Sequence, residues 1–164
     1  MPEPSNDSEL PNWHRRFASE ANNEAWRRSE AASRSPDEDQ AMVDAAHAAA
    51  YHWRAVGTDV QIARAVLLLA HVHALLGHGS VAMRHARTAF ESITSRRSPE
   101  WEVALAHAVL ANAASAVGDH ALHAQHHALA KSMGRALASA EEREIFDATF
   151  VRIPVPDADA PLAR

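Results

Sequence analysis

Short breaks that contain glycine, proline or serine divide this sequence into seven segments. Between the breaks alanine is abundant, the whole chain has only five glycines, and β-branched or aromatic runs are nearly absent. This composition favours α-helices, and connections this short require neighbouring helices to pack antiparallel. The breaks are Ser35-Pro36-Asp37, Gly57-Thr58-Asp59, Gly77-His78-Gly79-Ser80, Ser98-Pro99-Glu100, Gly118-Asp119 and Ala138-Ser139-Ala140.

The breaks predict both the helices and the domain organisation. Asp59 and Ser98 are the expected N-cap residues of the third and fifth helices, because short polar side chains accept hydrogen bonds from free helical N–H groups. A single helical domain is expected over 10–152, between a disordered tail at 1–9 and a proline-rich tail at 153–164. The predicted helices span 11–33, 37–56, 59–76, 79–96, 99–117, 119–138 and 141–151.

Composition excludes several classes of function. The chain has no cysteine, which excludes disulfides, thiolate metal sites and a thiol nucleophile, and fits a reducing compartment. The longest apolar run, 65–70, is too short to cross a membrane, and the polar start shows no signal peptide, so we expect a cytoplasmic protein. The net charge of −5 lacks the basic excess of nucleic-acid binders. Neither a membrane nor a nucleic acid is therefore an expected partner.

An internal repeat indicates how the helices stack. Gly77 and Gly118 lie 41 residues apart, each after an apolar helix and before a segment of small residues. Small residues let adjacent helices approach, and glycine closes a hairpin. The first segment resembles the tetratricopeptide repeat, with Leu69-Ala70 at the position of its Leu-Gly pair and His73 at its tyrosine. The period is longer than that family's, and Pro99 matches its proline only loosely.

A second resemblance points the same way. The block Tyr51-His52-Trp53 and Val56-Gly57-Thr58, followed by Arg64 and an acidic helix near 141–150, is similar to a group of uncharacterised bacterial tetratricopeptide-like proteins. This resemblance covers roughly residues 40–150 and implies a fold but no activity. The expected fold is all-α: a right-handed α-solenoid of about three tetratricopeptide-like antiparallel hairpins plus a C-terminal capping helix.

One polar strip gives the candidate binding residues. Arg64 and His71 are seven residues apart on an otherwise apolar helix, so they share one face. Asn112 holds the position of His71 in the next hairpin, and the tetratricopeptide resemblance places this strip in a concave groove. An arginine there can fork to a carboxylate, and an asparagine can hold a peptide backbone. Alternatively, Arg64 pairs with an acidic neighbour and only ties repeats together; the candidates are Asp59, Glu100 and Glu102.

Further aromatic and histidine residues complete the candidate set. His52 is expected to cap a carbonyl or to reach the groove, and Trp53 to pack at the first hairpin corner. His73 lies on the apolar face and is expected to be a core residue. His123 and His127 have the i, i+4 spacing of zinc ligands, but they face away from the apolar stripe, so we expect the histidines of 120–127 to be solvated. No metal or cofactor is expected.

These observations predict a non-enzymatic binding module whose partner is a protein, a peptide or a small anionic ligand. A homodimer is plausible for a solenoid of this size. A hydrolytic enzyme, ribonuclease-like or metal-dependent, is the alternative, with Arg64, His71, His85 and His107 as candidates. A pH-responsive assembly is a third hypothesis, because protonating all 12 histidines would move the net charge from −5 to +7.

Overall fold

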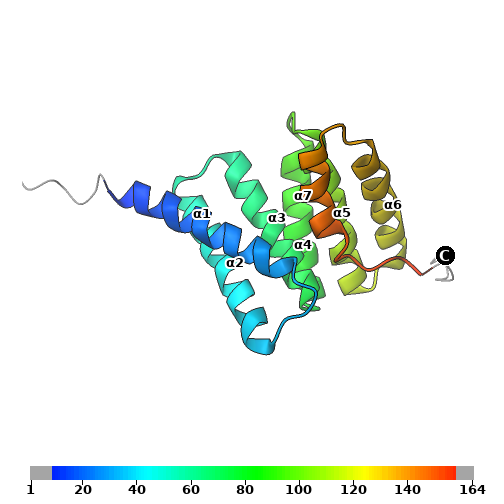
Figure 1. Cartoon of the computed structure of the whole chain (residues 1–164), viewed down its shortest axis with the longest axis horizontal. Helices are drawn as coiled ribbons and strands as arrows, with labels where there is room; N and C mark the ends of the chain where they lie inside the picture. Colours follow the sequence, from blue (N-terminus) through cyan, green and yellow to red (C-terminus); the bar gives the residue numbers. More distant parts are fainter. Residues whose placement is uncertain (1–8, 158–164) are drawn as a thin grey trace, which may run out of the picture.

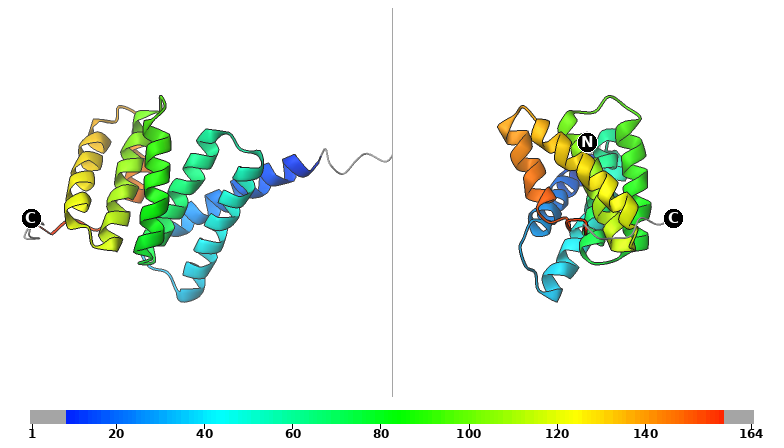
Figure 2. Two further views of the ribbon diagram at one scale, coloured as in Figure 1. Left: turned by 180° about the vertical axis from the view of Figure 1, so that it is seen from behind. Right: turned by 90° about the vertical axis from the view of Figure 1, so that its right-hand side faces the viewer.

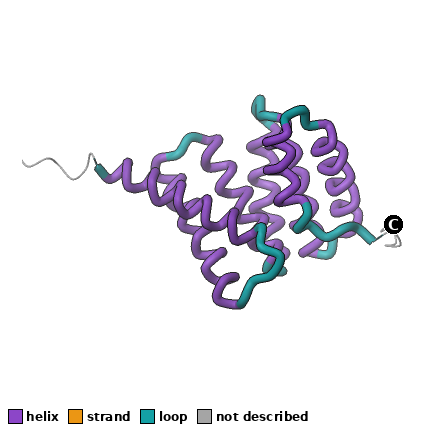
Figure 3. Tube along the Cα trace, viewed as in Figure 1, coloured by secondary structure: helices purple, strands orange, loops and turns teal. Residues whose placement is uncertain are grey.

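The computed structural model describes residues 9–157, so most of the tail predicted at 1–9 and residues 158–164 of the tail predicted at 153–164 lie outside the described residues. The start of the second tail packs on the domain, since Ile153 is 4% exposed. The described chain is helical and contains no strand (Figure 3), which confirms the all-α prediction. Within the same residues, no helix combines the length and hydrophobicity that a membrane span requires. The helices are α1 (Leu10–Ser29), α2 (Pro36–Val56), α3 (Asp59–Leu75), α4 (Gly79–Thr94), α5 (Glu100–Val117), α6 (His120–Ala136) and α7 (Ala140–Phe150).

The boundaries of α2 to α7 lie within two residues of those predicted, whereas α1 ends four residues early. The cause lies in the side chains at its end. The Ser29 hydroxyl donates to the carbonyl of Trp26 at 2.8 Å, and Arg34 Nη1 donates to the carbonyls of Arg28 and Ala31, each at 3.3 Å. These bonds add to the backbone bonds at the end of α1 and hold the following loop against its last turn.

Both predicted N-caps were wrong by one residue. Thr58 caps α3 through a capping box, in which the Gln61 side chain accepts from the Thr58 N–H at 2.9 Å and the Thr58 hydroxyl accepts from the Gln61 N–H at 3.5 Å. Asp59 is the first residue of the helix, where its charge suits the helix dipole. At α5 the N-cap is Pro99, and the Ser98 hydroxyl instead donates to the carbonyl of Ile93 at 2.7 Å.

Consecutive helices pack as neighbours, and the odd-numbered helices also contact one another in the order α1, α3, α5, α7. In Figure 1, α1 and α7 both lie on the face turned to the viewer, and they lie behind the other helices in the left view of Figure 2. The helices α3 and α5 are buried around most of their circumference because other helices cover them on several sides. Alanines fully buried on α4 and α5 allow this close packing; they are Ala82, Ala86, Ala89, Ala104 and Ala106.

A single glycine controls how closely α7 approaches α6. Gly134 is buried in α6, and a Cβ atom there would overlap the ring of Phe146 on α7. We therefore expect Gly134→Ala to lower the free energy of unfolding by about 1–3 kcal/mol, although alanine is the better helix former. Urea unfolding measures the change, and Ser132→Ala, at an exposed position of the same helix, is the control. An unchanged or higher stability of Gly134→Ala would contradict the tight α6–α7 contact.

Candidate functional site

A cavity of about 220 Å³ opens among α1, α3, α5 and α7, and we call it the binding pocket. Its walls are mainly apolar, with two tryptophans from different helices. The volume is below the roughly 300–1,000 Å³ of sites for drug-sized ligands, and it suits one inserted side chain. The lining residues are Trp26, Glu30, Arg64, Leu67, Trp101, Glu102, Leu105, Ile145 and Thr149.

Arg64 is the basic residue of this pocket and is held in a fixed direction. Its Nε and Nη2 donate to the two carboxylate oxygens of Glu102, at 3.1 and 3.4 Å. The guanidinium carbon also lies 5.1 Å from the ring centre of Trp101. The Arg64 side chain remains 43% exposed, whereas the Glu102 side chain is completely buried. Arg64 therefore presents a preorganised cation at the pocket wall.

Glu102 is shared by two arginines. Arg96 Nη2 donates to the same carboxylate at 2.6 Å, and Arg96 lies in the connection between α4 and α5. Two guanidinium groups therefore meet one carboxylate, which leaves one positive charge in excess. Glu30 adds an exposed carboxylate to the wall formed by α1. The pairing of Arg64 with Glu102 is one of the alternatives considered from the sequence.

The structure corrects the expected placement of His71 and Asn112. Both are buried, at 0% and 3% exposure, and Asn112 Nδ2 lies 3.1 Å from His71 Nδ1. The Trp26 ring stacks on His71 with centroids 5.7 Å apart, so α1 covers the strip that was expected to be open. His71 and Asn112 therefore do not line the binding pocket beside Arg64. His71 instead supports Trp26, which forms one wall of that pocket.

The other two candidate binding residues also lie away from the pocket. His52 Nδ1 pairs with His14 Nδ1 at 2.9 Å, between α1 and α2, and Trp53 packs against the apolar cluster of α2 and α3. Conversely, Trp26, Trp101 and Ile145 line the pocket without having been candidates. No local signal marks these residues, because four separate helices create the cavity.

Most histidines pair with one another. His73 is buried, as predicted, and its two ring nitrogens lie 3.1 Å from His47 Nε2 and 3.1 Å from His78 Nδ1. His107 Nδ1 and His126 Nδ1 are 2.8 Å apart. In such a pair one ring donates and the other accepts, so at least one member must be neutral. These pairs connect helices and need no ligand to satisfy them.

Of the histidines on α6 that were predicted to be solvated, His120 is exposed, but the prediction was wrong for the others. His123, His126 and His127 are only 4%, 8% and 8% exposed. His126 packs against Phe90 of α4 and His107 of α5, whereas α7 and the chain after it cover His123 and His127. The His127 ring lies 4.8 Å from that of Phe150, and His123 Nε2 donates to the carbonyl of Pro154 at 2.8 Å. Among residues 9–157, no group of three or more histidine, aspartate and glutamate side chains is arranged to hold a metal ion.

Burial keeps several of these histidines neutral. It lowers the pKa of His71 to about 3, with a smaller effect from the charge of Arg34. Burial, followed by the neighbouring histidines, lowers the pKa of His73 and of His107 to about 4. The four residues considered for catalysis also lie at separate places: Arg64 pairs with Glu102, His71 with Asn112 and His107 with His126, and the His85 ring stacks on His73.

Comparison of the chain with known protein families, with curated proteins and with solved structures found no match. The interpretation of the site therefore depends on its own geometry. That geometry combines an apolar cavity among α1, α3, α5 and α7, a preorganised guanidinium on its wall, and tryptophan side chains from α1 and α5.

Proposed function

We propose that this protein is a non-enzymatic binding module whose partner is a protein or a peptide. The observation that carries the proposal is the binding pocket: its volume suits a single side chain better than a whole small molecule. In this proposal the hairpins α1–α2, α3–α4 and α5–α6 form a short right-handed solenoid of the tetratricopeptide type, with α7 as capping helix. The sequential contacts of α1, α3, α5 and α7 support that arrangement.

An apolar side chain of the partner is the proposed anchor in the binding pocket. Trp26 and Trp101 offer it aromatic walls, and Leu67, Leu105 and Ile145 complete an apolar surface. Burying one leucine or phenylalanine side chain contributes about 1.5–3 kcal/mol, which corresponds to roughly a tenfold to hundredfold change in Kd. Such an anchor, surrounded by weaker contacts, is the usual centre of binding energy in protein interfaces.

A carboxylate next to the anchor is the proposed second contact. The bonds to Glu102 use Nε and Nη2 of Arg64, which leaves the N–H groups of Nη1 for a partner. Arg96 adds a second positive charge beside Glu102, and the carboxylate of Glu30 on the pocket wall offsets it, so the preference for an acceptor depends on the Nη1 N–H groups of Arg64. A carboxylate is the acceptor that a guanidinium binds best, and the preferred partner segment therefore carries aspartate or glutamate beside an apolar residue.

Selection of a displayed random peptide library on the immobilised full chain tests this function. We expect the enriched peptides to share an apolar residue with an acidic neighbour. Ile145→Glu places a charge in the pocket wall at a side chain that is 47% exposed, so it is expected to raise the Kd of such a peptide at least tenfold without unfolding the protein. Isothermal titration calorimetry measures the Kd.

The matched control is Leu129→Glu, at a side chain on α6 that is 41% exposed and lies outside the pocket. It should bind the peptide as the wild type does. If no peptide is enriched, or if both variants bind with the wild-type Kd, the pocket is not the binding site and the proposed function is wrong.

A further inference from the structure

A second exposed apolar surface lies at the start of the helical array. It consists of Leu10, Trp13, Phe17 and Tyr51, which are 55%, 46%, 44% and 65% exposed, and we call it the aromatic edge. The rings of Trp13 and Phe17 stack with centroids 5.8 Å apart. This half of α1 projects beyond the rest of the helices (Figure 1). Contiguous exposed apolar side chains of this size usually mark an interaction surface.

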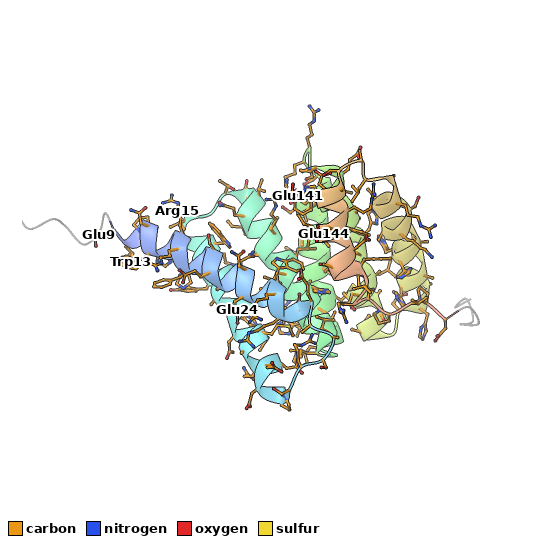
Figure 4. The ribbon with its side chains drawn as sticks, viewed as in Figure 1. Glu9, Trp13, Arg15, Glu24, Glu141 and Glu144 are labelled. Atoms are coloured by element: carbon orange, nitrogen blue, oxygen red, sulfur yellow. The ribbon has the colours of Figure 1, made fainter. Side chains whose placement is uncertain are left out.

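The aromatic edge is separate from the binding pocket. Trp26 follows Trp13 by 13 residues, which turns it about 220° around the axis of α1. Because Trp26 stacks on His71 of α3, Trp13 faces away from α3. Figure 4 shows Trp13 at the end of the molecule remote from Glu141 and Glu144 of α7. A partner on the edge and a partner in the pocket therefore use opposite flanks of α1.

A histidine pair makes the aromatic edge one rigid surface across two helices. His14 of α1 and His52 of α2 approach to 2.9 Å between their Nδ1 atoms. The His52 ring lies 5.6 Å from that of Phe17 and 5.2 Å from that of Tyr51. The pair thus connects Tyr51 of α2 with Phe17 of α1 into one surface, which reduces the rearrangement that binding requires.

We infer that the aromatic edge is covered by the same surface of a second copy of this chain, in a two-fold dimer. The hairpin α3–α4 has helices on both sides, α1 and α2 on one and α5 on the other, whereas α1–α2 has α3 on one side only. The neighbour that is missing there is another helical hairpin. A second copy supplies one, and a two-fold axis brings the same apolar residues together.

The area of the aromatic edge agrees with a dimer. Aromatic side chains bury about 150–250 Å² each, so the three half-exposed aromatic residues, together with the half-exposed Leu10, offer roughly 400 Å² of apolar surface per copy. Two copies would remove about 800 Å² of apolar surface from water, and apolar atoms make up about 65% of homodimer interfaces. The complete interface is then about 1,200 Å², at the lower limit of standard stable interfaces.

Charge also favours a second copy at this surface. Glu9, Arg16 and Glu20 lie on the same side of α1 as Trp13 and sum to a charge of −1, and Arg16 and Glu20 form an exposed ion pair at 2.9 Å. Two identical edges therefore meet with little charge repulsion. The helix α7 differs, because it carries an excess of acidic residues that would repel a second α7; they are Glu141, Glu142, Glu144 and Asp147 against Arg143.

Sedimentation equilibrium of the purified full chain tests the dimer. From about 1 to about 100 μM, where interfaces of this size associate, we expect the mass to rise to twice that of the chain. Trp13→Glu/Phe17→Glu is expected to stay monomeric, whereas Leu129→Glu on α6 should dimerise like the wild type. A wild type that stays monomeric would overturn the inference, and the aromatic edge would then be a surface for a different protein. A double variant that still dimerises would overturn it as well.

Cross-linking locates the interface without altering the apolar residues. The chain has no cysteine, so Arg16→Cys introduces a single thiol beside Trp13. A short bismaleimide should join two copies of Arg16→Cys but not of Ser132→Cys, whose thiol is exposed on α6. Equal cross-linking of the two variants, or none of Arg16→Cys, would contradict a contact through α1. Both experiments need no peptide partner, so they are independent of the proposed pocket function.

Discussion

Glu102→Ala is expected to lower the free energy of unfolding by about 3–5 kcal/mol, the usual effect of removing one partner of a buried ion pair. Glu102 is completely buried, and its carboxylate accepts hydrogen bonds from both Arg64 and Arg96. Without it, two guanidinium groups face each other beside an apolar pocket. A loss of this size is a large fraction of the stability of an ordinary domain, so the variant should be marginally folded.

Urea unfolding followed by circular dichroism measures this loss. Glu100→Ala is the matched control, because Glu100 is an exposed carboxylate in the first turn of the same helix. Its removal should change the free energy of unfolding by no more than about 0.5 kcal/mol. If Glu102→Ala is as stable as Glu100→Ala, then Glu102 does not organise the wall of the binding pocket.

Acid is expected to destabilise the protein strongly, through histidines that are neutral when folded. For His71 the folded pKa of about 3 lies below the ordinary value of 6.5, so the unfolded chain binds a proton that the folded chain does not. The contribution of neutral His71 to the free energy of unfolding is therefore fully present above pH 6.5, and it is lost as the pH falls toward 3. At 1.36 kcal/mol per pKa unit, His71 alone accounts for a loss of about 3 kcal/mol by pH 4. His73 and His107 act in the same direction.

Urea midpoints between pH 7.5 and pH 4 measure this dependence. The double variant His71→Leu/Asn112→Leu replaces both members of the buried pair with apolar groups, which can be nearly neutral for stability at pH 7. Its stability should fall less between pH 7 and pH 4 than that of the wild type. His120→Ala, at the exposed histidine that begins α6, should leave the wild-type dependence intact. Equal pH dependence in the wild type and the double variant would contradict a titration of His71.

The helices could be predicted from the sequence because their signals are local. Glycine, proline and capping residues mark the helix ends, and six of the seven helices differ from expectation by two residues or fewer at each end. The end of α1 was missed because Arg34, five residues beyond the helix, binds the carbonyl of Arg28 in its last turn and that of Ala31 in the loop. Such a bond depends on a loop conformation that helical periodicity does not describe.

The candidate site was predicted only in part. Arg64 lines a cavity, and its face of α3 could be predicted because it follows from the helical repeat. His71 shares the same strip, but the sequence did not indicate that Trp26 of α1 would cover it. The burial of His123 and His127 depends in the same way on α7 and Pro154, which pack onto α6 from a distant part of the chain. Exposure of a helix face is a tertiary property, and one helix cannot reveal it.

The indole N–H resonances of the four tryptophans provide the most direct test of the central claim. We would titrate a selected peptide into the isotope-labelled full chain and follow these signals by NMR. We expect the signals of Trp26 and Trp101 to shift, because both rings line the binding pocket, while those of Trp13 and Trp53 stay in place. Shifts confined to Trp13 or Trp53, with Trp26 and Trp101 unchanged, would show that the partner binds elsewhere.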